Sequence, residues 1–227
     1  MRRSTSSALA SGFATMNNPI ERLEPQLVPY ALAVGVLCKE WAFLESAARM
    51  LFIQAARMPL DRESFGIAHT LDIRDQLSAI KLAFVAKKKD RLVAEFGIKT
   101  INYIDNVLRP WRNRFVHDGW TYWRETNSVA RFNWNPRIFR PQANEPYDWS
   151  PVETAEDELP IILTTICEVS EHAAALADLQ FFFHGGGRSV LSKLLRSPPA
   201  RTLQPRQGVT PDPREQSPAK PKSPPQS

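Results

Sequence analysis

Two long stretches of this chain carry apolar side chains at alternating spacings of four and three residues. Between residues 27 and 57 the apolar positions are Tyr30, Val34, Leu37, Trp41, Leu44, Ala48, Leu51 and Ala55. Between residues 159 and 183 they are Leu159, Ile162, Ile166, Val169, Ala173, Leu176 and Phe183. Because an α-helix has ~3.6 residues per turn, each set lies along one face of a long helix. Burial of two such faces predicts a helical bundle.

Two shorter apolar stripes lie between the long ones. The first follows a predicted loop at residues 61–66 and an expected N-cap at Thr70, and consists of Ile73, Leu77, Ile80 and Phe84. The second consists of Ile101, Ile104, Leu108, Trp111 and Phe115. Pro110 interrupts the second stripe, so its helix must kink or restart, because proline lacks an amide donor and clashes with the preceding turn.

The segment after the second short stripe has a different pattern. Residues 120–123 and 130–134 alternate polar and aromatic side chains around a polar centre. This alternation is typical of a small hairpin, and an irregular loop fits it equally. The sequence therefore predicts an all-α fold, an antiparallel bundle of four to five helices, with a small hairpin or loop insertion after the helix that ends near His117.

The last long helix has two candidate starts. Residues 150–153 have the sequence of a capping box with proline at the first helical position, and Thr154 is the rival N-cap. Pro160 then lies in the first turns or makes a kink. After three consecutive glycines at 185–187, residues 188–196 are expected to form a short basic helix.

The ends of the chain differ from its centre in composition. Residues 1–24 are polar and have no apolar period, and residues 197–227 are rich in Pro, Gln and Ser. Neither segment can bury a core, so both are predicted to be disordered. The expected folded domain is residues 25–196.

The overall composition favours a soluble protein that meets anionic partners. The 227 residues have a net charge of +5, although part of the excess lies in the C-terminal segment. No uninterrupted apolar run reaches the ~20 residues of a membrane span, which predicts a cytoplasmic protein without membrane contact. Cys38 and Cys167 lie in predicted helices and are expected to be buried, reduced thiols. No spacing of Cys, His or carboxylate residues indicates a metal site, and we expect no cofactor.

Arg112, Asn113 and His117 place three kinds of polar side chain near one helix end. Arginine can hold phosphate oxygens in bidentate fashion, and histidine can transfer protons near neutral pH. Asn113 is four residues before His117, so it can orient the imidazole ring. The alternative interpretation is that His117 caps the helix and that its neighbouring arginines are solvated charges.

The pattern R-N-x-x-x-H over residues 112–117 resembles the motif of the HEPN superfamily, small all-helical domains of which many are endoribonucleases. In that family the motif lies late in a long helix and usually precedes a small residue. Here Asp118 and Gly119 follow, and the glycine is expected to cap the helix in the left-handed conformation. The resemblance covers about residues 27–184 and is architectural outside the motif.

The resemblance implies a metal-independent endoribonuclease in which the ribose 2′-hydroxyl attacks the adjacent phosphate. His117 would act as general acid or base, Arg112 would stabilise the charge on phosphorus, and Asn113 would orient the histidine. RNA is then the substrate, in a toxin-like or defence role. One alternative is a catalytically silent helical module for binding or dimerisation. Another is an interaction protein that works through its proline-rich C-terminus.

Helix geometry adds a constraint on the motif. Arg112 and His117 are ~140° apart around an ideal helix, so they converge only through the long arginine side chain, a bend near Pro110 or a partner chain. The family pairs two motifs in one cleft, which implies a homodimer, and a cognate regulatory protein is a further implied partner. Arg114, Trp120 and Trp123 are candidate RNA-binding residues, although packing against the bundle is the favoured interpretation for the two tryptophans.

Overall fold

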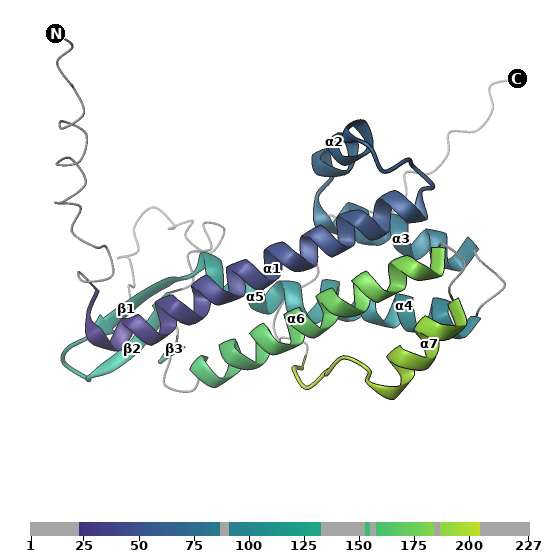
Figure 1. The fold of residues 1–227 in the computed structure, drawn as a ribbon. Helices are drawn as coiled ribbons and strands as arrows, with labels where there is room; N and C mark the ends of the chain where they lie inside the picture. Colours follow the sequence, from purple (N-terminus) through teal and green to yellow (C-terminus); the bar gives the residue numbers. More distant parts are fainter. Residues whose placement is uncertain (1–22, 87–90, 133–152, 155–157, 184–186, 205–227) are drawn as a thin grey trace, which may run out of the picture.

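The computed structural model describes residues 23–86, 91–132, 153–154, 158–183 and 187–204. This part of the chain is mostly helical, with one small antiparallel sheet (Figure 1). Its α-helices are α1 (Val28–Ala55), α2 (Arg62–Thr70), α3 (Ile73–Ala86), α4 (Arg91–Tyr103), α5 (Arg109–His117), α6 (Glu158–Phe183) and α7 (Gly187–Arg196). A 3-10 turn, η2 (Pro25–Leu27), leads into α1, and a π-helical turn, η3 (Ile104–Leu108), joins α4 to α5.

The two long helices predicted from the apolar stripes are confirmed as α1 and α6. Of the eight α1 stripe positions, five are buried: Leu37, Trp41, Leu44, Ala48 and Leu51. Helix α1 ends at Ala55, four residues before Pro59, and Arg57 there has a left-handed backbone with φ of 57°. Cys38 and Cys167 are exposed, contrary to the expectation. Each directly follows a stripe position, and the ~100° step between helical neighbours turns it away from the core.

The loop predicted at residues 61–66 and the N-cap predicted at Thr70 are wrong, because this segment forms α2. Asp61 caps α2: its Oδ1 accepts the backbone N–H of Ser64 at 2.8 Å, and this hydrogen bond lowers the pKa of the Asp61 carboxyl. Thr70 is the last residue of α2. Asp72 instead caps α3, since its Oδ1 accepts the N–H of Asp75 at 2.8 Å.

Pro110 is accommodated without ending its helix. Its missing N–H falls in the first turn of α5, and the wide η3 turn immediately precedes it. A π-helical turn breaks the regular i to i−4 pattern at the place where the proline ring would otherwise clash. The α4, η3 and α5 segments therefore form one nearly continuous helical run that ends at His117.

The predicted hairpin is confirmed. Strand β1 (Gly119–Trp123) pairs antiparallel with β2 (Ser128–Phe132), and β3 (Glu153–Thr154) extends the sheet along β2. Asn127 occupies the left-handed turn position with φ of 51°, and its Oδ1 accepts the Tyr122 hydroxyl at 2.6 Å. Gly119 begins β1 opposite Phe132, so it does not form the expected helix cap.

Helix α6 begins later than its predicted capping box. Residues 153 and 154 form strand β3 and the helix starts at Glu158, so Glu153 does not lie in its first turn and Thr154 is not its N-cap. Residues 150–152 lie outside the described part of the chain. Pro160 falls in the first turn of α6, as expected, where its missing N–H costs no helical hydrogen bond.

The helices are not uniformly antiparallel. Tyr30, near the start of α1, packs against Trp120, just after the end of α5, with the rings tilted and their centroids 5.2 Å apart. Arg114, near the end of α5, contacts Glu158 at the start of α6. Helices α1 and α6 therefore begin at the same end and run in the same direction, while α5 runs against both (Figure 1). The strictly antiparallel order that we expected does not hold for the two longest helices.

Two helical stretches are long and apolar enough to cross a membrane by length and composition. They are residues 25–55 and 158–183, with mean hydropathies of 1.5 and 1.3 in their most apolar windows. Both contribute to one shared core, and α6 also buries Glu168 and His172. Core helices of soluble proteins commonly have this composition, and the structure is compatible with a soluble protein.

The segment predicted to be disordered from residue 197 onward begins with residues bound to the helices. We call residues 197–204 the C-terminal strap. The backbone N–H groups of Thr202 and Leu203 donate to Glu168 Oε1 at 2.6 and 3.3 Å, and the Thr202 hydroxyl donates to the same oxygen. The Tyr103 hydroxyl donates to Glu168 Oε2 at 2.5 Å. The predicted boundary at residue 197 is therefore too early; residues 1–22 and 205–227 lie outside the described part.

Candidate functional site

The motif residues lie in the last two turns of α5, beside α1. Arg112 Nη1 lies 3.2 Å from His117 Nε2, within one chain. A guanidinium can only donate hydrogen bonds, so His117 Nε2 accepts in this contact. The length of the arginine side chain alone brings the two residues together. Neither a bend at Pro110 nor a partner chain is needed for this contact.

Asn113 contacts the arginine instead of the histidine. Its Oδ1 accepts from Arg112 Nη1 at 3.1 Å, so one guanidinium nitrogen serves both Asn113 and His117. The role expected for Asn113, orienting the ring directly, is replaced in this geometry by holding the group that contacts the ring. His117 is exposed, so the motif is open to a ligand from solvent.

Trp41 of α1 forms the surface beneath the arginine. The Arg112 guanidinium carbon lies 5.7 Å from the centre of the Trp41 ring, within the range of a cation–π interaction. The Trp41 indole N–H donates to Glu45 Oε1 at 2.7 Å. Sequence analysis placed Trp41 in the α1 core stripe and did not assign Glu45. Spacing within α1 gives no signal that this ring faces the motif.

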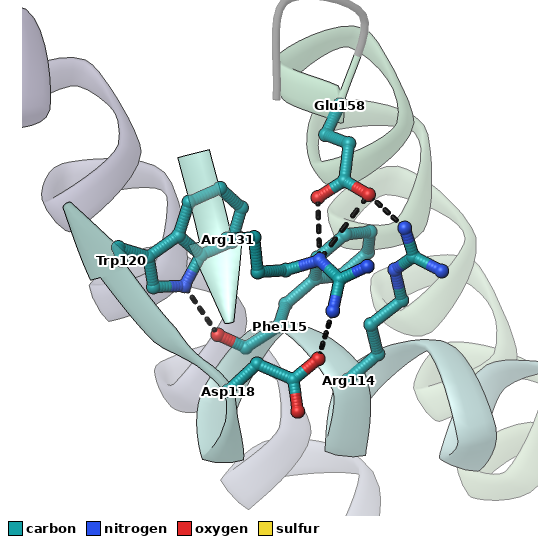
Figure 2. A network of polar contacts seen from close by, with 6 residues as sticks. All are labelled: Arg114, Phe115, Asp118, Trp120, Arg131 and Glu158. Carbon is teal, nitrogen blue, oxygen red and sulfur yellow. Dashed lines mark hydrogen bonds and ion pairs between the residues drawn. The ribbon is translucent and has the colours of Figure 1, made fainter. Parts of the chain in front are cut away.

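Arg114, which the sequence offered as a candidate RNA-binding residue, belongs to a buried ion-pair cluster. Its side chain is 8% exposed and donates to Glu158 (Figure 2). Arg131 of β2 is fully buried and reaches Glu158 Oε2 at 3.0 Å through Nε, while its Nη1 donates to Asp118. This cluster ties the ends of α5 and β2 to the start of α6.

Arg112 differs from the other arginines of its helical run. Arg109 pairs with Asp105 at 2.8 Å, and Arg114 pairs with Glu158. Arg112 has no carboxylate partner among the described residues, and its buried Nε has no hydrogen-bond partner there. The positive charge of α5 that remains for a ligand is therefore concentrated on Arg112.

The tryptophans predicted to stack on RNA bases have different positions. Trp120 packs between Tyr30 and Phe115 and donates its indole N–H to the Phe115 carbonyl at 3.1 Å (Figure 2). This arrangement fits the packing alternative. Trp123 is half-buried at the end of β1. Trp111 is also half-buried, and its N–H donates to the Gln204 carbonyl of the strap at 3.0 Å.

An apolar hollow lies next to the motif helix. It has a volume of about 180 Å³ and is lined by Leu23, Leu27, Tyr30, Ala31, Val34, Phe115, Val116 and Trp120. Its walls are mostly carbon, so it offers little to a phosphate. The polar chemistry of this region thus lies at Arg112 and His117.

The described residues contain no group of three or more His, Cys, Asp or Glu side chains arranged to hold a metal ion. Comparison of the chain with protein-family models, curated proteins and solved structures gave no match.

Proposed function

We propose that this protein is a HEPN-like, metal-independent endoribonuclease whose site is formed by Arg112, His117 and Asn113. The observation that supports the proposal is the state of Arg112: its charge has no carboxylate partner in the described chain, and it donates to the imidazole of a solvent-exposed histidine. A phosphate would satisfy the guanidinium, and the released imidazole nitrogen would be free to accept a proton.

In the proposed reaction, His117 Nε2 takes the proton from the ribose 2′-hydroxyl as that oxygen attacks the adjacent phosphorus. The bond from phosphorus to the 5′-oxygen breaks, and that oxygen gains a proton. The products are a 2′,3′-cyclic phosphate and a 5′-hydroxyl. Arg112 stabilises the added negative charge on the phosphoryl oxygens. DNA lacks the attacking hydroxyl and is not a substrate.

The reaction moves two protons, one from the 2′-oxygen and one to the 5′-oxygen, while each chain brings one motif histidine. We therefore propose a homodimer in which two His117 rings line one cleft, one as base and the other as acid. Two copies of Arg112 would make this cleft strongly positive and attract RNA. Its place in the cell is proposed to be the cytoplasm, with toxin-like activity and a cognate regulatory protein.

The test is cleavage of a mixed-sequence RNA by the purified full chain in EDTA. Wild-type protein is expected to leave 2′,3′-cyclic phosphate ends, and His117→Ala and Arg112→Ala are each expected to abolish cleavage. Arg124→Ala is the matched control, because Arg124 is exposed and pairs only peripherally with Glu24. Absence of cleavage by wild type, or cleavage that survives His117→Ala, would reject the endoribonuclease; RNA binding without cleavage would favour the silent module.

A further inference from the structure

Trp41 and Glu45 lie one helical turn apart on α1 and form a pair beneath Arg112. The indole N–H donates to the carboxylate at 2.7 Å, while the indole face lies 5.7 Å from the guanidinium carbon. Trp41 is only 3% exposed, so its ring is fixed by the core. Glu45 makes no ion pair within the described part of the chain, and its one hydrogen-bond partner there is Trp41.

An aromatic ring face and a carboxylate stabilise a guanidinium in different ways. A carboxylate binds two N–H groups of an arginine in the plane of the guanidinium, which removes them from any other anion. An aromatic face attracts the same charge from above the plane and uses no N–H donor. Resting on Trp41, Arg112 is stabilised without use of an N–H donor. Nη1 serves Asn113 and His117 and Nε is buried, so the donors that stay available for a phosphate are those of Nη2.

Glu45, bound at the edge of the Trp41 ring, strengthens the attraction between the ring face and Arg112. An indole that donates to a carboxylate is polarised, so more negative charge lies on its π face, and hydrogen bonds in a chain reinforce one another in this way. The carboxylate also fixes the rotation of the indole. Negative charge thereby acts on Arg112 through Trp41 without Glu45 competing for the arginine donors.

Arg114 provides the internal comparison. Its guanidinium carbon lies 5.4 Å from the centre of the Trp111 ring, a similar cation–π distance. Arg114 is nevertheless paired directly with buried Glu158. Helix α5 thus carries two arginines that each lie over a tryptophan. Arg114 is also in direct contact with a carboxylate, whereas the carboxylate near Arg112 is bound to the indole N–H at the edge of Trp41.

We infer that Trp41 and Glu45 are positioning residues that hold Arg112 against His117 with its outer donors open to an RNA phosphate. The effect of these two residues on catalysis rests on the proposed function, whereas their effect on the position of Arg112 does not. Conservative substitutions at Trp41 or Glu45 are therefore expected to lower kcat/KM, although neither residue contacts the substrate.

The test uses Glu45→Gln, Trp41→Phe and Trp41→Leu in the full chain. Glu40→Gln is the matched control, since Glu40 is a carboxylate on the same helix that pairs with Lys39 at 3.4 Å. Two readouts are needed besides thermal unfolding: the NMR resonance of the Arg112 Nε–H, and kcat and KM for RNA cleavage. Trp41→Leu opens the core and can unfold the chain, so Glu45→Gln and Trp41→Phe carry the test.

Glu45→Gln and Trp41→Phe are each expected to shift the Arg112 resonance and to lower kcat/KM by roughly threefold, and a folded Trp41→Leu by roughly tenfold or more. Glu40→Gln should change neither readout. An Arg112 resonance and a kcat/KM that stay at wild-type values in both conservative variants would overturn the positioning role. A shifted resonance in a chain that cleaves no RNA would support the positioning and reject the endoribonuclease.

Discussion

At the scale of single residues, Arg112 and Arg114 are expected to differ sharply when each is replaced by alanine. Arg114→Ala removes one partner of buried Glu158 and should lower the free energy of unfolding by about 3 kcal/mol. Arg112→Ala breaks no ion pair among the described residues and should lower it by about 1 kcal/mol or less. Urea denaturation of both variants measures the difference.

Arg124→Ala serves as the control for the loss of a positive charge, because Arg124 is 80% exposed, and its melting temperature should match wild type. If Arg112→Ala unfolded as readily as Arg114→Ala, Arg112 would have a structural role and the helix-capping interpretation of His117 would gain support.

The stability of the strap is expected to depend on pH through Glu168 and His172. Burial opposes the charge on Glu168, but hydrogen bonds from Thr202 and Tyr103 hold its pKa below the usual value of 4.5. Burial lowers the pKa of His172 from 6.5. Both groups bind protons more readily in the unfolded chain. Stability is therefore fully present above pH 6.5 and falls with acidity, first through His172 and then, below pH 4.5, through Glu168.

Thermal unfolding between pH 4 and 8 checks this dependence, with His172→Gln as the diagnostic variant. Its melting temperature should lose most of the slope between pH 6.5 and 5 and keep the slope at lower pH. The charged groups near His172 are Glu168, Glu171 and Arg201, and His172→Gln leaves all three in place. An unchanged slope near pH 6 in His172→Gln would assign it to another histidine.

The sequence predicted the motif residues but not their contacts. Arg112, Asn113 and His117 are close in sequence, so they share the last turns of α5, and the long arginine side chain closes the distance to His117. The partner of Arg114 is Glu158, 44 residues away and beyond the hairpin. Such a pairing depends on how the helices are arranged, and spacing along one chain contains no information about it.

At the scale of secondary-structure elements, two helical glycines make a matched pair. A Cβ added at Gly97 of α4 would lie 2.7 Å from the ring of Phe84, which is buried on α3. A Cβ added at Gly35 of α1 would meet nothing within 4 Å. Gly35→Ala should therefore stabilise the protein by about 1 kcal/mol through helix propensity. Gly97→Ala should destabilise it by about 1 to 3 kcal/mol through overpacking.

Circular dichroism during chemical denaturation gives both values. Stabilisation by Gly97→Ala would mean that α3 and α4 do not approach as closely as the Phe84 contact requires. Destabilisation by Gly35→Ala would mean that something covers this exposed position of α1 in solution.

Apolar periodicity predicted those helices that bury a continuous stripe of apolar side chains in the core. Helices α1, α3, α5 and α6 were found in this way. Helix α2 was missed because it buries only Ser64 and Ala68 and depends on the Asp61 cap. The relative direction of α1 and α6 was also missed, since a stripe shows which face is buried but not which helix covers it.

At the scale of the whole molecule, the strap connects the C-terminal segment to the core, and truncation tests how much it contributes. A chain that ends at Gln204 should keep the melting temperature of the full protein. A chain that ends at Arg196 loses three of the hydrogen bonds to buried Glu168 and should be destabilised by about 2 kcal/mol or more. Equal melting temperatures for the two truncated chains would show that the strap contributes little.

The strap could not be predicted from apolar pattern, because it is held mainly by its backbone. Thr202 and Leu203 donate backbone N–H groups, and Gln204 accepts through its carbonyl from Trp111. Every residue type except proline carries an N–H donor, so such binding leaves no trace in composition. The high proline content of this region is typical of disorder, whereas the partners that hold residues 197–204, among them Glu168, Glu171 and Trp111, lie on helices distant in sequence.

The proposed homodimer makes the most specific prediction about the assembled protein. Within one chain Arg112 and His117 are already in contact, so a monomer has a complete motif but a single proton-transfer group. If two chains share a cleft, mixing Arg112→Ala with His117→Ala chains under conditions of exchange creates heterodimers with one intact arginine and one intact histidine. Cleavage should then recover to a small fraction of the wild-type rate, above that of either variant alone. Sedimentation of the mixture verifies exchange. No recovery in demonstrated heterodimers, or full activity from a wild-type chain that sediments as a monomer, would reject the shared cleft and place the reaction within one chain.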